Sequence, residues 1–586
     1  MAQRGPSSVR PENGQPTLTP PTFATYYENA VVTARTRNPS RRDEPFQKLP
    51  EGPLIGGDVA KHLHRLRDEI YENRRKTAEE RSKRPSVADF YKGRHVLVTG
   101  GSGFLGRMLI EQLLRTCRDI GNIYIVLRAK KGESPERRLQ ALVSVQLFDR
   151  LRAEQPDALS KIIVLPGDIT ALGLGLSRQH QDLVRREVSV VYHVAASVRF
   201  DDPIQKAILT NVRSTREVVE LARGMRIAAL VHVSTAYTNM DQYDPVLEKV
   251  YPTEVDWRSA IRMAEEMSSA DLWAMDCLGH KLRGFHVNTY TFTKAMAEKV
   301  IDDVAEELPV IIVRPSIVIP AYKDPIPGWI DNLNGMGGMW AAGGKGLIRV
   351  LYEPNPVIFN TVPADLAVKN TILASWVCGQ NFSLSAEESV RRGANVVNAT
   401  TPGDQRLGVT HKDMAFGVEN LSNRIAFPGC VRDPKTVQAK NYVLYTMLHW
   451  YHHILFSIVL DTAARLTGRK PRLLMYQRNV MVGLQATEPF MKTFNFGMEN
   501  QNYLQTIIHP KDEEAYSTLD FYGARASKET LMDWAYNCVR GVMVYTLKEE
   551  VKPENVDQIP KLKMLMKLYH GTIAALVAMA VYVMVG

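Results

Sequence analysis

Cysteine is scarce in this sequence, with 5 residues in a chain of 586. They stand far apart, at Cys117, Cys277, Cys378, Cys430 and Cys538. Because no two of them have the close spacing of a metal or disulfide motif, we expect no bound metal and a reducing compartment. A signal peptide is not expected either, since the first residues lack an apolar core.

The chain also lacks a strong excess of charge, with a net charge of +10. Such a balance suits an anionic membrane surface or phosphorylated ligands, and we expect no nucleic-acid partner. Residues 1–55 are rich in Pro, Ser, Thr and Arg, and we expect them to be disordered. A charged helix is predicted from about 58 to 83, so residues 1–85 form an N-terminal extension.

Long uncharged runs are rare, and one of them ends the sequence at residues 568–586. About 20 apolar residues span a bilayer, so we predict a membrane anchor over 561–586, with a buried terminal helix as the alternative. Lys561, Lys563 and Lys567 precede the run and place the preceding domain on the cytosolic side. We expect the endoplasmic reticulum membrane, with the peroxisomal membrane as the alternative, since no SKL or KDEL signal is present.

A second uncharged run covers residues 441–460 and has basic residues on both sides. Symmetric flanks do not favour a spanning helix, so we predict a helix in the membrane interface or a re-entrant hairpin. His449, His452 and His453 have helical spacing, but no carboxylate or cysteine joins them. They are therefore interpreted as polar residues facing the protein interior or the lipid headgroups.

Short apolar runs alternate with amphipathic stretches between residues 92 and 320. The runs that predict strands are 95–99, 122–128, 161–168, 188–194, 229–237 and 309–319. Their nearly continuous Val, Ile and Leu content is typical of strands covered on both faces. We predict an α/β fold, a Rossmann-type doubly wound parallel sheet over 86–380. A connecting region over 381–440 and a mainly helical C-terminal domain over 441–560, with membrane-associated segments, would follow.

The stretch VLVTGGSGFLGRML, residues 96–109, places glycines between a predicted strand and a predicted helix. Gly100 permits the tight turn, Gly103 admits a pyrophosphate, and Gly106 allows close packing of helix and strand. The N-terminus of the helix then faces the phosphates. This context predicts a dinucleotide site.

No acidic residue follows the second predicted strand where an NAD ribose would need one, up to Glu133. Arg128 stands there instead and could hold a 2′-phosphate, which indicates NADP(H), unless the segment is only a solvated basic loop. Asp168 and Ile169 are placed to contact the adenine. Ala195 and Ala196 would leave room for the middle of the cofactor.

Tyr290 and Lys294 are four residues apart on a predicted helix and therefore share one face. A nearby ammonium is expected to lower the pKa of the phenol and prepare it for proton transfer. The predicted strand at 229–237 carries Ser234 and Thr235, whose hydroxyls could hydrogen-bond a substrate carbonyl.

The motifs TGGSGFLG, STAY, YTFTK and VRPSIV, in this order, resemble the extended short-chain dehydrogenase/reductase superfamily. More narrowly, SVADFYKGRHVLVTGGSGFLG, HVAASVRFDD, TNVRSTRE and HVSTAYTN resemble the fatty acyl-CoA reductases of animals, as does AYNCVRGVMVYTLKEE near the end. The resemblance covers roughly residues 86–586.

The resemblance implies that Thr235, Tyr290 and Lys294 are catalytic. It implies a cofactor site for NADPH made of Thr99, Gly100, Ser102, Gly103, Phe104, Leu105, Gly106, Arg128, Asp168, Ile169, Ala195, Ala196, Ser234, Tyr290, Lys294 and Pro315. The substrate would be a long-chain acyl-CoA whose thioester carbonyl is polarised by Thr235 and Tyr290. Hydride addition and loss of the CoA thiol give an aldehyde, and a second hydride gives the primary alcohol.

Other interpretations stay open at this point: a thioester reductase that releases aldehyde, a dehydrogenase of the same superfamily acting on a sugar or sterol, or an inactive NADP-binding membrane scaffold. The lipid bilayer is an expected partner, and a homodimer is left open. Residues 241–287 could form a lid or acyl-channel wall, or plain core. Residues 335–346 could form a loop that admits the acyl chain or CoA, or an ordinary surface loop.

Overall fold

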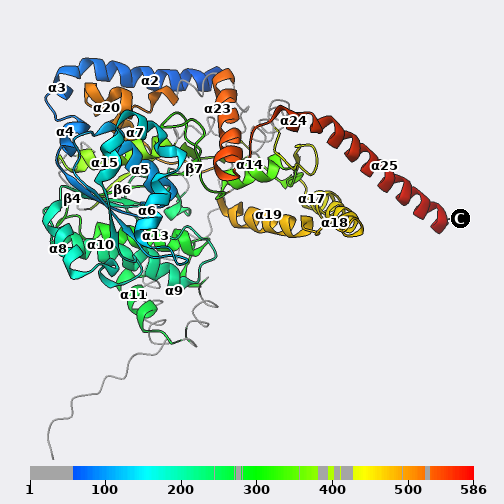
Figure 1. The fold of residues 1–586 in the computed structure, drawn as a ribbon, viewed down its shortest axis with the longest axis horizontal. Coiled ribbons are helices and arrows are strands. Elements are labelled where there is room, and N and C mark those ends of the chain that lie inside the picture. The colour runs from blue at the N-terminus through cyan, green and yellow to red at the C-terminus, as the bar shows by residue number, and fades with distance from the viewer. Residues whose placement is uncertain are drawn as a thin grey trace, which may run out of the picture.

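The computed structural model describes residues 57–242, 245–268, 281–355, 357–380, 393–400, 426–490, 492–521 and 528–585, together with 271, 279, 409 and 410. The segment expected to be disordered, 1–55, lies outside the described residues, and so does most of 269–280. The described chain forms a sheet body and a set of C-terminal helices that extend away from it (Figure 1).

The core of the body is a seven-stranded sheet in the order β11-β6-β5-β4-β1-β2-β3, with every neighbouring pair parallel. Its strands are β1 (His95–Thr99), β2 (Ile123–Leu127), β3 (Ile162–Pro166), β4 (Val188–His193), β5 (Ala229–Val233), β6 (Val310–Val313) and β11 (Asn395–Val397). This order is the doubly wound arrangement, whose topology reverses between β1 and β4. The predicted fold class is confirmed.

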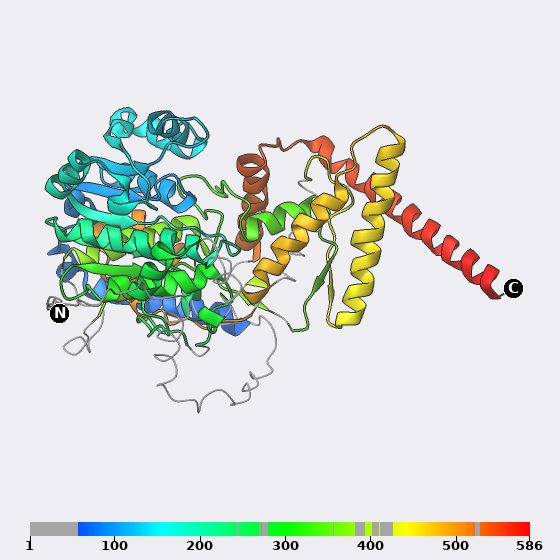
Figure 2. The same cartoon turned by 90° about the horizontal axis from the view of Figure 1, so that it is seen from below.

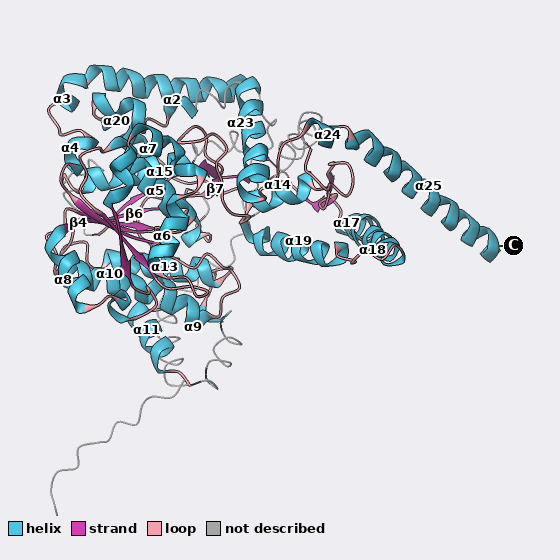
Figure 3. Ribbon diagram, viewed as in Figure 1, coloured by secondary structure: helices cyan, strands magenta, loops and turns pink. Residues whose placement is uncertain are grey.

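Helices cover both faces of the sheet, as Figure 3 shows with the strands in magenta between cyan helices. On one face, α5 (Phe104–Thr116) and α15 (Ala364–Cys378) pack on Val96 and Val98. On the other, α8 (Arg178–Glu187), α10 (Ser214–Arg223), α11 (Trp257–Glu266) and α13 (Thr289–Asp302) pack around Leu97. Successive strand residues alternate between the faces, so β1 contributes to both cores.

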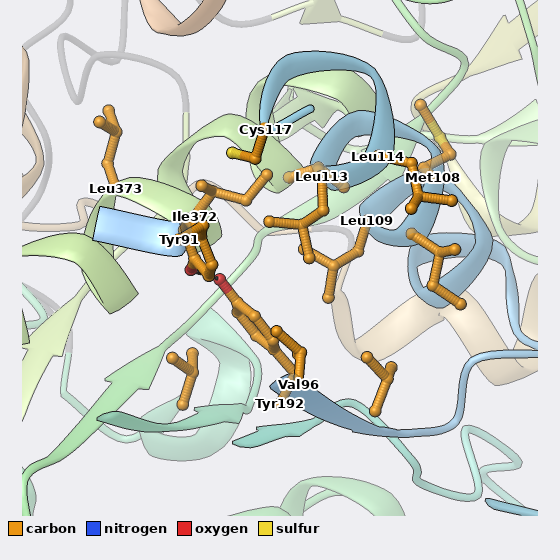
Figure 4. Close-up of a cluster of buried hydrophobic side chains, with 14 of the residues drawn as sticks. Tyr91, Val96, Met108, Leu109, Leu113, Leu114, Cys117, Tyr192, Ile372 and Leu373 are labelled. Atoms are coloured by element: carbon orange, nitrogen blue, oxygen red, sulfur yellow. Dashed lines mark hydrogen bonds between the residues drawn. The ribbon is translucent and has the colours of Figure 1, made fainter. Parts of the chain in front are cut away.

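One of these cores holds a buried polar contact (Figure 4). The hydroxyls of Tyr91 and Tyr192 lie 2.5 Å apart, and Tyr91 also donates to Ser375. Both rings are surrounded by apolar side chains of α5 and α15. The contact satisfies two phenols that would otherwise be buried without a partner.

The predicted strand 309–319 is not one strand. It forms β6 in the main sheet and β7 (Ile317–Ile319), which pairs with β10 (Thr361–Pro363) in a separate sheet. Pro315 lies between them, and a proline has no N–H to continue a ladder. The last strand of the main sheet, β11, comes from the segment expected to be a connection. The short pairs β8 (Val350–Tyr352) with β13 (Val437–Ala439), and β9 (Ile358–Phe359) with β12 (Val409–Thr410), complete the strands described.

The N-terminal helices pack on the body from outside the sheet. These are α2 (Gly57–Lys76), α3 (Ala78–Ser82) and α4 (Val87–Tyr91). Arg74 donates to the Gln505 carbonyl at 2.7 Å, which ties α2 to α20 (Glu499–Ile507). Arg81 also donates to Glu513 of α21 (Glu513–Tyr516) at 2.8 Å. The charged helix predicted near 58–83 is therefore present and contacts residues far along the chain.

Beyond the sheet, α17 (Tyr442–His449), a π-helical turn (Trp450–Leu455) and α18 (Phe456–Leu466) form one continuous helix. The re-entrant hairpin considered for 441–460 is therefore wrong, because neither Gly nor Pro interrupts this stretch before Gly468. The next helix, α19 (Leu473–Thr487), runs back toward the body, whereas α25 (Gln558–Val585) projects outward (Figure 2).

Residues 335–346, expected to be a loop, instead contain α14 (Met336–Gly344). A Cβ at Gly344 would overlap the Phe427 ring. The close approach of the helix to this ring therefore requires glycine at position 344. The remaining helices are α6 (Pro135–Val143), α7 (Asp149–Glu154), α9 (Ile204–Ala207), α23 (Lys528–Gly541) and α24 (Pro553–Val556).

Candidate active site

The glycine-rich turn lies at the carboxyl end of β1, where the strand order reverses. Gly100 has φ of +77°, and a Cβ on it would come within 2.6 Å of the Ala195 nitrogen. A Cβ on Gly106 would overlap the Gly100 carbonyl oxygen. The turn therefore requires glycine at both positions, as the sequence predicts, and it brings Ala195 beside the turn.

The third glycine, Gly103, precedes α5 and is exposed. Among the described residues no side chain caps this helix. The first N–H groups of a helix, here those of Phe104, Leu105 and Gly106, have no intrahelical acceptor and favour an anion. Ser102 is half-buried in the same turn. This edge therefore has the geometry that a pyrophosphate needs.

Arg128 and Asp168 meet at the ends of β2 and β3. The Arg128 Nη1 atom lies 3.0 Å from Asp168 Oδ2, and 57% of the Arg128 side chain is exposed. Asp168 also accepts hydrogen bonds from the Thr170 N–H and hydroxyl, and Ile169 lies between them, half-buried. An exposed guanidinium beside a carboxylate held by other donors can exchange its partner for a phosphate.

The three predicted catalytic residues come together from β5 and α13. Asn288 caps α13 by accepting from the Thr291 N–H at 2.9 Å, which fixes the start of the helix just before Tyr290. Thr235 directly follows β5 with Ser234, and its hydroxyl lies close enough to Tyr290 to lower the pKa of that phenol. Lys294, one turn along α13, is buried. The sequence spacing thus placed the hydroxyls and the amine on adjoining elements.

The electrostatics of this group differ from the expectation. Burial raises the pKa of Tyr290 to about 12, against the hydrogen bond from Thr235, which lowers it. Burial also lowers the pKa of Lys294 to about 7, against the charge of Glu298, which raises it. The expectation that an ammonium acidifies the phenol is therefore wrong for this structure, because removal of the phenol from water raises its pKa by more than its neighbours lower it. A phenol with a raised pKa keeps its proton at neutral pH and can donate it.

Two buried histidines, which the sequence reasoning missed, lie near Lys294. Lys294 Nζ is 3.2 Å from His232 Nε2 and donates to the Val233 carbonyl at 2.6 Å. The His232 and His193 ring centroids are 5.2 Å apart. Burial lowers the pKa of His193 to about 3 and that of His232 far below its usual value, so both rings are neutral. The signal for them in the sequence is the presence of a histidine within each of two apolar strands.

The last of the predicted cofactor residues flank this group. Thr99 bonds His193 Nδ1 at 2.7 Å, so its side chain is occupied within the protein. The Pro315 carbonyl accepts from the Ala236 N–H at 3.0 Å and therefore lies next to Thr235 along the same edge. Ala196 is half-buried after β4. The Ser234 Oγ atom is buried and has no partner among the described residues, which leaves it available to a bound polar group.

Aromatic side chains lie beside Tyr290, and no pattern in the sequence predicted them. The Phe200 ring centroid lies 5.9 Å from that of Tyr290 and 5.0 Å from that of Phe490. Phe490 also meets Tyr237 edge-on at 5.1 Å. Phe490 is 200 positions after Tyr290 in the sequence, so only the fold brings it near.

Comparison with known proteins gives two family matches, each described as a male sterility protein. One covers residues 98–371 as an NAD-binding domain, and the other covers residues 452–549. The chain is 33% identical over 471 residues to fatty acyl-CoA reductase 1 of Xenopus laevis, covering 80% of this chain and 87% of that protein. It is 29% identical over 488 residues to fatty acyl-CoA reductase 2 of Bos taurus, covering 83% and 91%.

Among solved structures, the chain is similar to the terminal R domain from the myxalamid PKS-NRPS biosynthetic pathway. The TM-score is 0.43 at 21% sequence identity, covering 71% of this chain and 91% of that one.

Proposed function

This chain belongs to the fatty acyl-CoA reductases, and we propose that it reduces a long-chain fatty acyl-CoA to the primary fatty alcohol with NADPH. The observation that supports this most directly is the group of Thr235, Tyr290 and Lys294 at the carboxyl edge of β5, beside the glycine-rich turn of β1. A dinucleotide-binding edge and a protonated phenol are the two parts that carbonyl reduction needs.

The proposed cofactor site runs along one edge of the sheet. The N–H groups at the start of α5 would hold the pyrophosphate, and Arg128 the 2′-phosphate. Ser234, whose buried hydroxyl has no partner among the described residues, would contact a polar group of the bound molecules. Reduced nicotinamide supplies hydride when it is bound there.

The protein's own groups then act on the thioester oxygen. The hydroxyls of Thr235 and Tyr290 lie close together and would both bind that oxygen, stabilising the charge that develops on it. Tyr290 would supply the proton, and its raised pKa keeps it in the donor form. Loss of the CoA thiol gives an aldehyde, and the same groups would serve the second reduction to the alcohol.

Lys294 would position the cofactor's ribose and, through its neutral or charged form, control how readily Tyr290 gives up its proton. Its pKa of about 7 lies near the working pH, which is where a group that exchanges protons is most effective.

Product analysis tests the reaction. Purified protein incubated with a long-chain acyl-CoA and excess NADPH should yield the primary alcohol, with two NADPH oxidised for each CoA thiol released. Aldehyde accumulating with one NADPH per thiol would instead identify a reductase that stops at the aldehyde. No thiol release with any acyl-CoA, together with turnover of a sugar or sterol, would overturn the proposal.

The choice of NADPH rests on Arg128 and has its own test. Replacing Arg128 with Gln should weaken NADPH binding about 10- to 100-fold, the cost of one charge-assisted phosphate contact, and leave NADH binding unchanged. Arg186→Gln, another exposed arginine of the same body, is the control. Equal losses for both cofactors would remove Arg128 from phosphate recognition.

We also propose that the C-terminal helices attach the protein to a membrane. Among the described residues, two helices, Tyr442–Leu466 and Glu554–Val583, are long and apolar enough to cross one, and few of their apolar residues are buried. The basic residues before the last run favour a catalytic body on the cytosolic side. The endoplasmic reticulum is the proposed membrane and the peroxisome the alternative, to be separated by protease protection and co-fractionation.

A further inference from the structure

Two stacked phenylalanines connect the catalytic tyrosine to the C-terminal helices. The Phe200 and Phe490 rings are 26° from parallel, and Phe200 contacts Tyr290. Phe490 ends the short 3-10 turn Glu488–Phe490, which directly continues α19. A helix of the C-terminal domain therefore ends within one aromatic ring of the proposed proton donor.

The contact extends into an aromatic wall, made of Phe200, Tyr237, Phe490, Phe494 and Phe496. Phe494 and Phe496 each meet Tyr237 edge-on, at 5.6 and 5.5 Å. Tyr237 follows Thr235 by two residues, so the wall borders both proposed catalytic hydroxyls. Its hydroxyl donates to the Asn360 carbonyl at 3.2 Å. The wall rings are buried, apart from Phe200, which is partly buried, so the protein next to Tyr290 is apolar on this side.

From this wall α19 leads outward to the helices proposed to enter the membrane. Its 15 residues make it about 22 Å long, comparable with an extended long-chain acyl group. Figure 2 shows α19 spanning the space between the sheet body and α17–α18, and α18 packs on it at its far end.

The exposed side of α19 carries both apolar and polar side chains. Met475 and Val482 are seven residues apart on one face and are 53% and 57% exposed. Arg478 and Asn479 lie between them and are also exposed. A Cβ at Gly483 would meet nothing within 4 Å, so the surface beside Val482 is open. Apolar side chains exposed at these positions favour contact with an apolar ligand.

We propose that the aromatic wall binds the first methylene groups of the acyl chain, and that α19 guides the remainder of the chain toward the bilayer. This inference rests on the proposed function and names the residues that select its substrate. The aromatic wall offers no cation to the CoA phosphates, so the fatty chain is the part of the substrate that fits it. Chains long enough to follow α19 would be preferred over short ones.

The test compares acyl-CoAs of graded chain length, using kcat/KM for each. In the wild type, each further methylene that is buried should raise kcat/KM by up to about fourfold. Phe490→Ala removes the ring between Phe200 and Tyr237 and should lower the preference for long over short chains about 10-fold, while short chains are still reduced. Phe490→Leu should lower it less.

Phe148→Ala is the matched control, because Phe148 is also buried but packs in the separate core cluster around α5. It should lose comparable stability and keep the wild-type chain-length preference. An unchanged preference in Phe490→Ala and Phe490→Leu would overturn the proposed acyl path. Absence of thiol release in the wild type with every chain length would instead overturn the proposed function itself.

A second variant tests α19 without touching the wall. Met475→Ser combined with Val482→Ser should slow reduction of a long-chain acyl-CoA embedded in phosphatidylcholine vesicles severalfold, and leave the rate for a short, soluble acyl-CoA unchanged. Both substitutions are at exposed positions, so folding should be affected little. If the double variant changed the rates for the two substrates by the same factor relative to wild type, the acyl chain would not travel along α19.

Discussion

The sheet body and the C-terminal helices place polar and apolar side chains in opposite ways. The body buries Lys294, His232, Arg314 and Glu298 at its centre. The helices α17–α18, α19 and α25 expose large apolar side chains instead, among them Trp450, which is 62% exposed. A soluble domain is expected to show neither pattern on this scale.

Both patterns, the buried charges of the body and the exposed apolar side chains of the helices, have a physical use. A charge taken out of water interacts more strongly with its neighbours, which is what a proton-transfer site needs. An apolar face is stable outside a protein only when the medium is itself apolar, as in a bilayer. The buried charges lower the folding stability of the body and serve its chemistry, whereas the exposed apolar side chains of the helices match the membrane attachment proposed above.

The largest effect is expected at the catalytic edge. Tyr290→Phe removes the proton donor and should lower kcat about 10²- to 10⁴-fold, with NADPH affinity nearly unchanged. Tyr192→Phe, which removes another buried hydroxyl on the same sheet, is the control and should keep most of the activity. Stopped-flow kinetics measure the rate of hydride transfer, and a cofactor titration measures the affinity for NADPH. Full turnover in Tyr290→Phe would show that Tyr290 is buried at this edge but does not supply the proton.

The next effect concerns the ion pair in the body. Arg314 Nη2 lies 2.6 Å from Glu298 Oε2, and both side chains are almost fully buried. Glu298→Leu leaves the guanidinium without its partner and should lower the free energy of unfolding by about 3–5 kcal/mol. Thermal unfolding checks it. The double variant with Arg314→Met should recover much of the loss, and failure to recover would mean that the arginine's bonds to the Leu247 and Lys249 carbonyls matter more.

Two valines of similar exposure compare the regions directly. Val577 on α25 is 57% exposed and Val198 in the body is 52% exposed. Val577→Asp should weaken partitioning into vesicles by about 2.5–3.5 kcal/mol, because a carboxylate is poorly accommodated in lipid. Val198→Asp should leave vesicle co-sedimentation unchanged. Similar behaviour of the two variants would contradict the assignment of α25 to the membrane.

The smallest effect is a pH dependence of stability. The pKa of Lys294 falls from 10.5 to about 7 on folding, so between these values the unfolded chain binds more protons. Stability of the cofactor-free protein should therefore rise with pH above 7, by about 1 kcal/mol per pH unit from this group. Unfolding by urea at several pH values measures it. Lys294→Met should flatten the slope, and an equal slope in the variant would assign it to other groups.

Much of the body could be predicted from the sequence because its signals are local. Strands β1 to β5 begin and end within a few residues of the apolar runs, and Gly100 is required by its own backbone angle. The relation of Tyr290 to Lys294 follows from one helical turn. By contrast, Pro315 indicates a break between two strands, but the apolar residues on both sides of it led to the prediction of a single strand over 309–319.

Contacts between distant segments could not be predicted in this way. The sequence contains Phe490 and His232 but no pattern that relates them to Tyr290 and Lys294, because their proximity depends on how α19 and β5 pack. The direction of the Tyr290 pKa shift was missed for the same reason, since burial is a property of the whole fold.

The sequence by itself determined the order of strands and helices, the glycines of the turn and the apolar character of the last helix. These follow from residue-by-residue preferences and short spacings. Only the tertiary structure decided which side chains are removed from water, and therefore which hydroxyl keeps its proton. It also decided that Phe490, which follows α19, stacks on Phe200 next to Tyr290, because burial and contact depend on segments that meet only when the chain has folded.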